Sequence, residues 1–283
     1  MGQPKDSRPT GFSRDLSEAS ENRDGGEWNA RSQRQVISGR DVHVWRWSLT
    51  LGSGHLGRWF DLLSDEEQKR AARFHFQVDR ERFVVARGCM RMLLAGYLDQ
   101  PPERIRFRYG THGKPELDIS GTGSFLQFNL SHSHEIALCA LARGRRVGVD
   151  VEKVARESVD GVAIADKFFT TEEAQKVRSA RPEARAEVFL RIWTRKEAYL
   201  KGLGEGITSS LNQFNVSLED SMLRSATGAD EAPNWSLHEL YPYPGFIAAV
   251  AVEGGCDSLT LLDFSSPDGD RDAVAKRRKT APN

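Results

Sequence analysis

The order of the apolar segments constrains the fold more than any other feature of this sequence. Segments rich in β-branched and aromatic residues come in groups, and segments with apolar residues at helical spacing separate these groups. The expected strands are 42–49, 105–109, 125–130, 136–142, 147–151, 214–218, 235–240, 246–252 and 259–264. Helices are expected from Ser64, where a capping box opens, and over 79–98, 171–180 and 183–203. Strands and helices that come in groups, instead of alternating one by one, predict an α+β fold.

Polar segments flank this region. Residues 1–40 and 265–283 are charged and poor in large apolar side chains, so we expect two disordered tails. Between them, the strand and helix content before and after about Val147 is loosely similar. We therefore expect an N-terminal lobe over 41–146 and a C-terminal lobe over 147–264.

The composition excludes several classes of protein. Lys plus Arg and Asp plus Glu each number 40, so the net charge is 40 − 40 = 0, which argues against a strongly basic nucleic-acid binder. The three cysteines, Cys89, Cys139 and Cys256, lie far apart and suit neither a disulfide framework nor a zinc site. No apolar run approaches the roughly 20 residues that span a bilayer. We expect a cytoplasmic protein that contacts no membrane.

The segment Val147-Gly148-Val149-Asp150-Val151-Glu152 carries the clearest chemical signal. Side chains alternate faces along a strand, so the three valines share an apolar face while Gly148, Asp150 and Glu152 share the other. Two neighbouring carboxylates repel each other unless a cation joins them, and Mg²⁺ prefers oxygen ligands. The pattern indicates a metal site; a solvated strand edge is the alternative.

A second signal lies on the helix expected over 183–203. Trp193, Glu197 and Lys201 are four residues apart and share one helix face. Glu197 could join a metal site or accept a proton, and Lys201 could reach a phosphate oxygen. A surface Glu–Lys pair beside a core tryptophan is the alternative.

Further polar residues stand near expected strand ends and turns. In Phe128-Asn129-Leu130-Ser131-His132-Ser133, adjacent Ser131 and His132 would point apart, and the G-x-S-x-G setting of a hydrolase serine is missing. His132 is therefore better suited to contact a phosphate than to activate Ser131, although a purely structural strand end fits as well. Lys114 follows Gly113 in a turn, and several arginines follow the long helix. Such arginines bind anions or simply face solvent.

The order and spacing of these pieces resemble one known family. G-K-P, F-N-L-S-H-S, G-V-D-V-E, F-F-T-T-E-E and W-T-R-K-E-A-Y-L-K, in this order, resemble the 4′-phosphopantetheinyl transferase superfamily, and in particular its long, monomeric, broad-specificity, surfactin-synthetase-activating type. The resemblance runs from about Val42 to Phe264. It implies two similar lobes that form a pseudo-dimer, with the cofactor and substrate in the cleft between them.

The resemblance also implies an activity. The family transfers the 4′-phosphopantetheine arm of coenzyme A to a serine of an apo acyl or peptidyl carrier protein and releases adenosine 3′,5′-bisphosphate. Such carriers serve fatty acid, polyketide and nonribosomal peptide synthesis. The cofactor would be Mg²⁺, with Mn²⁺ as the alternative ion, and a monomer is expected.

Residue roles follow from the same resemblance. Asp150, Glu152 and Glu197 match the metal-binding carboxylates, and Asp150, Glu197 and Lys201 are the expected catalytic residues. Coenzyme A would be bound by basic and polar residues, namely Lys114, Ser131, His132, Arg82, Arg87, Lys196 and Lys201. The basic residues available before the Arg73-Phe74 segment for its 3′-phosphate are Lys69, Arg70 and Arg73.

Three other functions fit part of the pattern. A Mg²⁺-dependent phosphohydrolase of coenzyme A or a nucleotide would use the same carboxylates and lysine. A non-catalytic coenzyme A binder would not need them. A nucleic-acid binder would depend on the basic run over 276–279.

Overall fold

A computed structural model describes residues 29–30, 36–37, 39–50, 56–111, 113–118, 126–154, 160–205, 211–221, 223–225 and 234–264. The second expected tail, 265–283, and most of the first, 1–40, lie outside these residues. Asn29–Ala30 lie within the first tail and form β1, which pairs with a strand near the other end of the chain. At these two residues the expected disorder is therefore wrong.

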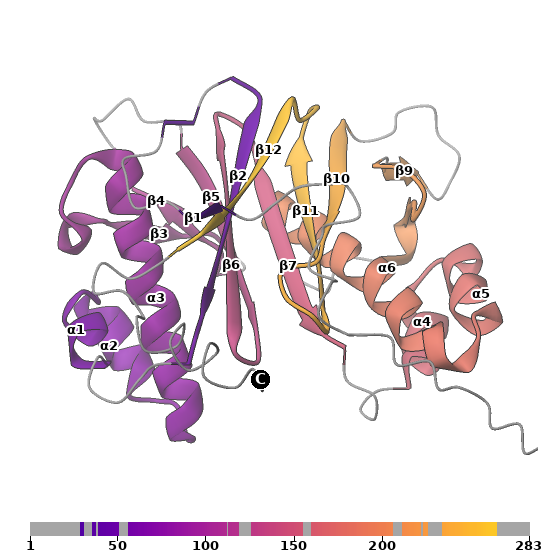
Figure 1. The fold of residues 1–283 in the computed structure, drawn as a ribbon, viewed down its shortest axis with the longest axis horizontal. Helices are drawn as coiled ribbons and strands as arrows, with labels where there is room; N and C mark the ends of the chain where they lie inside the picture. Colours follow the sequence, from indigo (N-terminus) through magenta and orange to yellow (C-terminus); the bar gives the residue numbers. More distant parts are fainter. Residues whose placement is uncertain are drawn as a thin grey trace, which may run out of the picture.

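The first sheet has five strands in the order β1-β12-β2-β6-β5. Its longer strands are β2 (Asp41–Ser48), β5 (Leu126–Ser133), β6 (Ile136–Arg143) and β12 (Ser258–Asp263). β2, β6 and β5 pair antiparallel, while β12 runs parallel to β2. Beside this sheet lie α1 (Leu56–Asp61), α2 (Asp65–Ala71) and the long helix α3 (Gln77–Leu98), as Figure 1 shows.

The second sheet has three antiparallel strands in the order β10-β11-β7. They are β10 (Trp235–Leu240), β11 (Phe246–Glu253) and β7 (Val147–Lys153). Its helices are α4 (Gly161–Phe168), α5 (Thr171–Ser179) and α6 (Pro182–Leu203). Two short hairpins complete the fold, β3 (Phe107–Tyr109) with β4 (Pro115–Leu117), and β8 (Phe214–Val216) with β9 (Leu223–Ser225).

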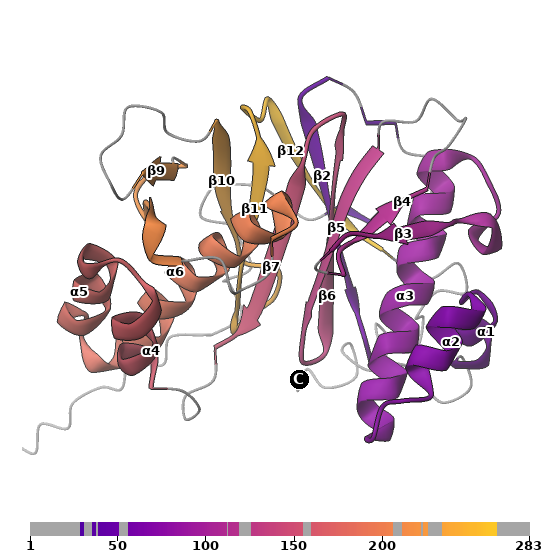
Figure 2. The same cartoon turned by 180° about the vertical axis from the view of Figure 1, so that it is seen from behind.

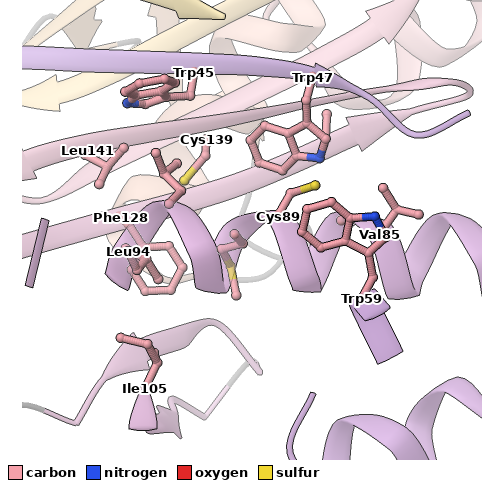
Figure 3. Packing of buried hydrophobic residues seen from close by; sticks show 14 of the residues in the cluster. Trp45, Trp47, Trp59, Val85, Cys89, Leu94, Ile105, Phe128, Cys139 and Leu141 are labelled. Atoms are coloured by element: carbon pink, nitrogen blue, oxygen red, sulfur yellow. The ribbon is translucent and has the colours of Figure 1, made fainter. Parts of the chain in front are cut away.

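The two sheets lie next to each other in the middle of the molecule, with helices on both outer sides (Figures 1 and 2). Apolar residues from both sheets, such as Val44, Ala140, Val149 and Val250, form one buried cluster. A second cluster joins α1 and α3 to the first sheet; Figure 3 shows Trp59 among its members. A third lies around α6. Because burial of apolar surface is the main driving force of folding, these clusters hold the layers together.

The grouping of strands and helices correctly predicted the α+β class. The capping box at Ser64 is confirmed, since its hydroxyl accepts from the Glu67 N–H and the Glu67 carboxylate accepts from the Ser64 N–H. The short helices α1 and α4 were not predicted. None of the helices in the described part of the chain has the length and apolar character to cross a membrane.

One expected boundary is wrong. The second lobe was expected to extend to residue 264, but β12 pairs with β2 in the first sheet. The apolar side chains of Leu261 and Leu262 are buried there. The last described strand therefore belongs to the sheet formed mainly by the first half of the chain.

Helix α6 packs directly on β7 at Gly148. A Cβ atom at this position would lie 2.0 Å from the backbone oxygen of Ala198 and 2.3 Å from the backbone nitrogen of Gly202. Only glycine leaves room for so close a helix. The space beside Gly148 is thus occupied by the backbone of α6.

Candidate active site

Strand β7 presents the two carboxylates that the sequence singled out. The valine side chains of β7 are buried in the cluster between the sheets, and Asp150 and Glu152 project from the opposite face. Asp150 is only 3% exposed, whereas Glu152 is half-buried. The predicted alternation along this strand is confirmed.

Helix α6 brings two more charged groups to the same place. Lys201 forms an ion pair with Asp150 Oδ1, and its Nζ donates to Ser131 Oγ over 3.0 Å. Ser131 Oγ in turn donates to Asp150 Oδ1 over 3.1 Å. Glu197 lies one helical turn before Lys201 and is buried. The close packing at Gly148 thus places the helix residues over the strand carboxylates.

The carboxylates of this cluster influence each other's ionisation. Burial, followed by the charge of Asp150, raises the pKa of Glu197 to about 7. Burial and then Asp150 also raise the pKa of Glu152. Glu197 Oε1 and Asp150 Oδ2 are buried and have no hydrogen-bond partner among the described residues. Three acidic groups with one lysine leave an excess of negative charge, which a cation would relieve.

The protein side chains alone do not complete a metal site. In the ranges that the structure describes, no three or more His, Cys, Asp or Glu side chains are assembled as a complete metal site. The two unpartnered oxygens nevertheless fit a hard cation that takes its remaining ligands from water and substrate phosphates, as Mg²⁺ commonly does.

His132 lies on the other face of β5 from Ser131, as predicted. Ser131 is buried and His132 is exposed. Desolvation lowers the pKa of His132, and the positive charges of Lys201, Arg82 and Arg70 lower it further. The charges of three cations thus act on one imidazole, and such a region suits an anion.

One of these cations, Arg70, lines a surface pocket of about 660 Å³. It is lined by residues of α2, of the turn that follows it and of β3, namely Glu66, Glu67, Lys69, Arg70, Arg73, Phe74 and Tyr109. All three basic residues that the sequence offered for a 3′-phosphate line this pocket. Aromatic and basic side chains together suit a phosphorylated nucleoside.

Lys114 connects the β3–β4 hairpin to the other sheet. Its Nζ donates to the backbone oxygen of Gly202 over 3.0 Å and to that of Val147 over 3.4 Å. Burial lowers its pKa to about 8. Lys114 therefore lies at the C-terminal end of α6, next to the last helical turn, which contains Lys201.

Two residues expected to bind coenzyme A lie elsewhere. Lys196 has no exposed surface, forms an ion pair with Glu173 over 2.8 Å and donates to backbone oxygens of Leu211 and Phe214. Arg87 is 5% exposed and is paired with Glu67 and the Tyr109 hydroxyl. The burial of both cations and their pairing with buried carboxylates argue against these two assignments.

The sequence reasoning overlooked Ser133. Its hydroxyl donates to Glu152 Oε2 over 3.0 Å. Asn129, Ser131 and Ser133 are two residues apart, so the period of the strand could have placed all three on one face.

Comparison with known proteins identifies the family. The 4′-phosphopantetheinyl transferase superfamily model matches residues 146–251, and a model of the N-terminal part of a 4′-phosphopantetheinyl transferase matches residues 52–144. The chain is 38% identical to the 4′-phosphopantetheinyl transferase HetI of Nostoc over 227 residues, which are 80% of this chain and 94% of the relative.

Two more distant relatives agree. The 4′-phosphopantetheinyl transferase Sfp of Bacillus subtilis is 26% identical over 196 residues, 69% of this chain and 84% of the relative. The L-aminoadipate-semialdehyde dehydrogenase-phosphopantetheinyl transferase of Xenopus laevis is 28% identical over 190 residues, 62% of this chain and 63% of the relative. The chain belongs to the 4′-phosphopantetheinyl transferase superfamily, as its motifs predicted, and is an enzyme that transfers phosphopantetheine to carrier proteins.

Proposed function

We propose that the cluster of Asp150, Glu152, Glu197 and Lys201 transfers the 4′-phosphopantetheine arm of coenzyme A to a serine of an apo acyl or peptidyl carrier protein. Buried, unpartnered oxygens on Asp150 and Glu197 beside the ammonium of Lys201 carry this proposal. The carriers would be those of fatty acid, polyketide or nonribosomal peptide synthesis. We further propose a cytoplasmic monomer whose cleft lies between two similar lobes.

Asp150, Glu152 and Glu197 are the proposed ligands of Mg²⁺, or of Mn²⁺. When bound, the ion would neutralise the negative charge of the diphosphate, which otherwise repels the incoming serine oxygen. These three side chains suit a divalent ion, because all are carboxylates and hard divalent ions prefer oxygen ligands. Burial, and then the neighbouring carboxylate of Asp150, raises the pKa of both Glu152 and Glu197, as expected for acidic groups that await a cation.

The reaction requires a proton acceptor and a stabilised leaving group. Glu197 Oε1 is proposed to take the proton of the carrier serine as its oxygen bonds to the phosphorus that bears the pantetheine. The bond from that phosphorus to the bridging oxygen breaks, and the electron pair leaves with adenosine 3′,5′-bisphosphate. Lys201 stabilises the negative charge that develops there. A pKa of about 7 suits Glu197 to accept a proton near neutral pH.

The nucleotide half of coenzyme A is assigned to the basic pocket. Lys69, Arg70 and Arg73 are proposed to bind the 3′-phosphate, with Phe74 and Tyr109 beside the adenine. Ser131, His132, Arg82 and Lys114 are proposed to contact the diphosphate. The electrostatic influence of Arg82, Arg70 and Lys201 on His132 supports a continuous positive region from the pocket to the carboxylates.

The variant Glu197→Gln tests the proposed base. We expect its turnover to fall by about 10²–10⁴-fold, since that is the usual contribution of general base catalysis. Coenzyme A binding, measured by calorimetry, should change little, because the pocket residues remain. Undiminished turnover in this variant would remove Glu197 from the role of base.

The variant Asp150→Ala tests the metal assignment. It should lose both activity and the response to added Mg²⁺, since Asp150 is the most buried of the three carboxylates. Full activity with unchanged metal dependence would contradict the assignment.

A further inference from the structure

We propose that Ser133 is a positioning residue that orients the Glu152 carboxylate through its hydroxyl. The inference rests on the proposed function, in which Glu152 is a metal ligand. Ser133 itself is 7% exposed and touches neither of the other two carboxylates in any described contact. Its effect would therefore pass through Glu152 alone.

The edge strands of the two sheets meet at β5 and β7, and side chains join them. Among the described residues these strands have no backbone pairing, since β5 pairs with β6 and β7 with β11. Asn129, Ser131 and Ser133 on β5 all point toward β7. The Val149 N–H donates to Asn129 Oδ1 over 2.8 Å. Side-chain hydrogen bonds at two-residue intervals thus join the two strands in place of the backbone hydrogen bonds of a continuous sheet.

Each serine in this series bonds one of the strand carboxylates. Ser131 donates to Asp150, and Ser133, two residues on, donates to Glu152, which is two residues beyond Asp150. The matching intervals come from the extended backbone of both strands. Ser131 also binds Lys201, so it belongs to the active site already described. Ser133 has no such link and serves Glu152.

The Ser133 hydroxyl is the donor to Glu152, because a carboxylate oxygen accepts hydrogen bonds. The same hydroxyl oxygen accepts from the backbone N–H of Lys153 over 3.3 Å while its proton is donated to Glu152 Oε2 over 3.0 Å. His134 Nδ1 lies 3.2 Å from the same oxygen and is the other group that can share it. An ion pair between Lys153 and Glu135 joins the same strand ends over 2.9 Å.

Glu152 needs an orienting partner more than Asp150 does. Asp150 is buried and bonded to both Ser131 and Lys201, whereas Glu152 is half-buried and has a longer side chain with more rotamers. One hydrogen bond to a buried hydroxyl selects a rotamer that keeps the carboxylate near Asp150. Partners of this kind commonly change metal affinity by about 10–100-fold when they are removed.

The test compares Ser133→Val with Ser133→Thr. These replacements have the same shape, but only threonine keeps the hydroxyl. Mn²⁺ binding to the purified protein with coenzyme A, followed by electron paramagnetic resonance, gives a readout that needs no turnover. We expect Ser133→Val to weaken Mn²⁺ binding by about 10-fold and Ser133→Thr to stay within about 3-fold of the wild type. In the transfer assay, Ser133→Val should need more Mg²⁺ for half-maximal rate, with the rate at saturating Mg²⁺ largely kept.

Ser236→Ala is the matched control. Ser236 on β10 donates to the backbone oxygen of Gly254 over 3.0 Å, so its replacement also removes one serine hydrogen bond. It should leave Mn²⁺ binding unchanged. Equal Mn²⁺ binding by Ser133→Val and Ser133→Thr would overturn the inference, whether both match the wild type or both are weakened. Failure of the wild type to modify any carrier would instead contradict the proposed function, so the two failures are distinguishable.

Discussion

The replacement Gly148→Ala should separate the helix that carries Glu197 and Lys201 from the strand that carries Asp150. The added methyl group would lie 2.0 Å from the Ala198 backbone oxygen, and ordinary contact begins at 3.4 Å. The difference, 3.4 − 2.0 = 1.4 Å, is the displacement that α6 would need at this point. The atoms in the way are backbone, so no side-chain rotation can relieve the overlap.

Two effects of this displacement can be estimated. A misplacement of about 1 Å at an active site costs on the order of 10²-fold in rate, equivalent to about 2.7 kcal/mol. Overpacking of a well-packed core costs about 1–3 kcal/mol of unfolding free energy. The variant should therefore fold with a lowered melting temperature and retain about a hundredth of the wild-type turnover.

Carrier modification and thermal unfolding measure both effects on one preparation. Gly96→Ala is the control, because Gly96 lies exposed on α3 with nothing within 4 Å of the added Cβ. Alanine at that helical position should stabilise the protein by up to about 1 kcal/mol and leave turnover unchanged. If Gly148→Ala kept wild-type turnover and stability, the close contact of α6 with β7 would not be what places the catalytic groups.

Three further perturbations have defined outcomes. Lys196→Met should destabilise the fold by about 3–5 kcal/mol in chemical denaturation, because it removes the cation that is paired with the buried Glu173 carboxylate; coenzyme A affinity of the folded protein should stay unchanged, and a specific loss of that affinity would restore Lys196 to the binding site. Glu197→Gln should raise the unfolding free energy by about 1–2 kcal/mol more at pH 8 than at pH 4, because a carboxylate whose folded pKa is raised from 4.5 to about 7 costs folding free energy that builds up as pH rises between these two values; an equal change at both pH values would contradict this. Coenzyme A affinity, measured by calorimetry, should weaken as pH rises through about 8, where Lys114 loses its proton, and Lys114→Met should lack this step.

The local patterns of the sequence predicted much of the fold. The capping box gave the start of α2, and the alternation in β7 gave the apolar face and the acidic face. Helices α1 and α4, of six and eight residues, are too short for an apolar period to reveal them. The pairing of β12 with β2 joins residues more than 200 positions apart, and nothing in either strand specifies its partner.

Sequence patterns predicted only part of the site, because a local pattern does not show which distant residue a side chain will contact. Asp150, Glu197 and Lys201 belong to short motifs, and the structure brings them together. Lys196 and Arg87 were assigned to coenzyme A because a charged residue in a motif looks the same in sequence whether it faces a ligand or a buried partner. Only the packing shows that Glu173 and Glu67 take these two cations. Ser133 was overlooked because a serine gains its role from the strand opposite it.

Intact-mass spectrometry of an apo carrier protein tests the central claim most directly. The carrier is incubated with this enzyme, coenzyme A and Mg²⁺, and coenzyme A is quantified in the same tube. We predict a gain of one phosphopantetheine on the carrier serine, abolished by a chelator and severely reduced by Glu197→Gln. Consumption of coenzyme A with no gain in carrier mass would contradict the account and would instead indicate a Mg²⁺-dependent phosphohydrolase.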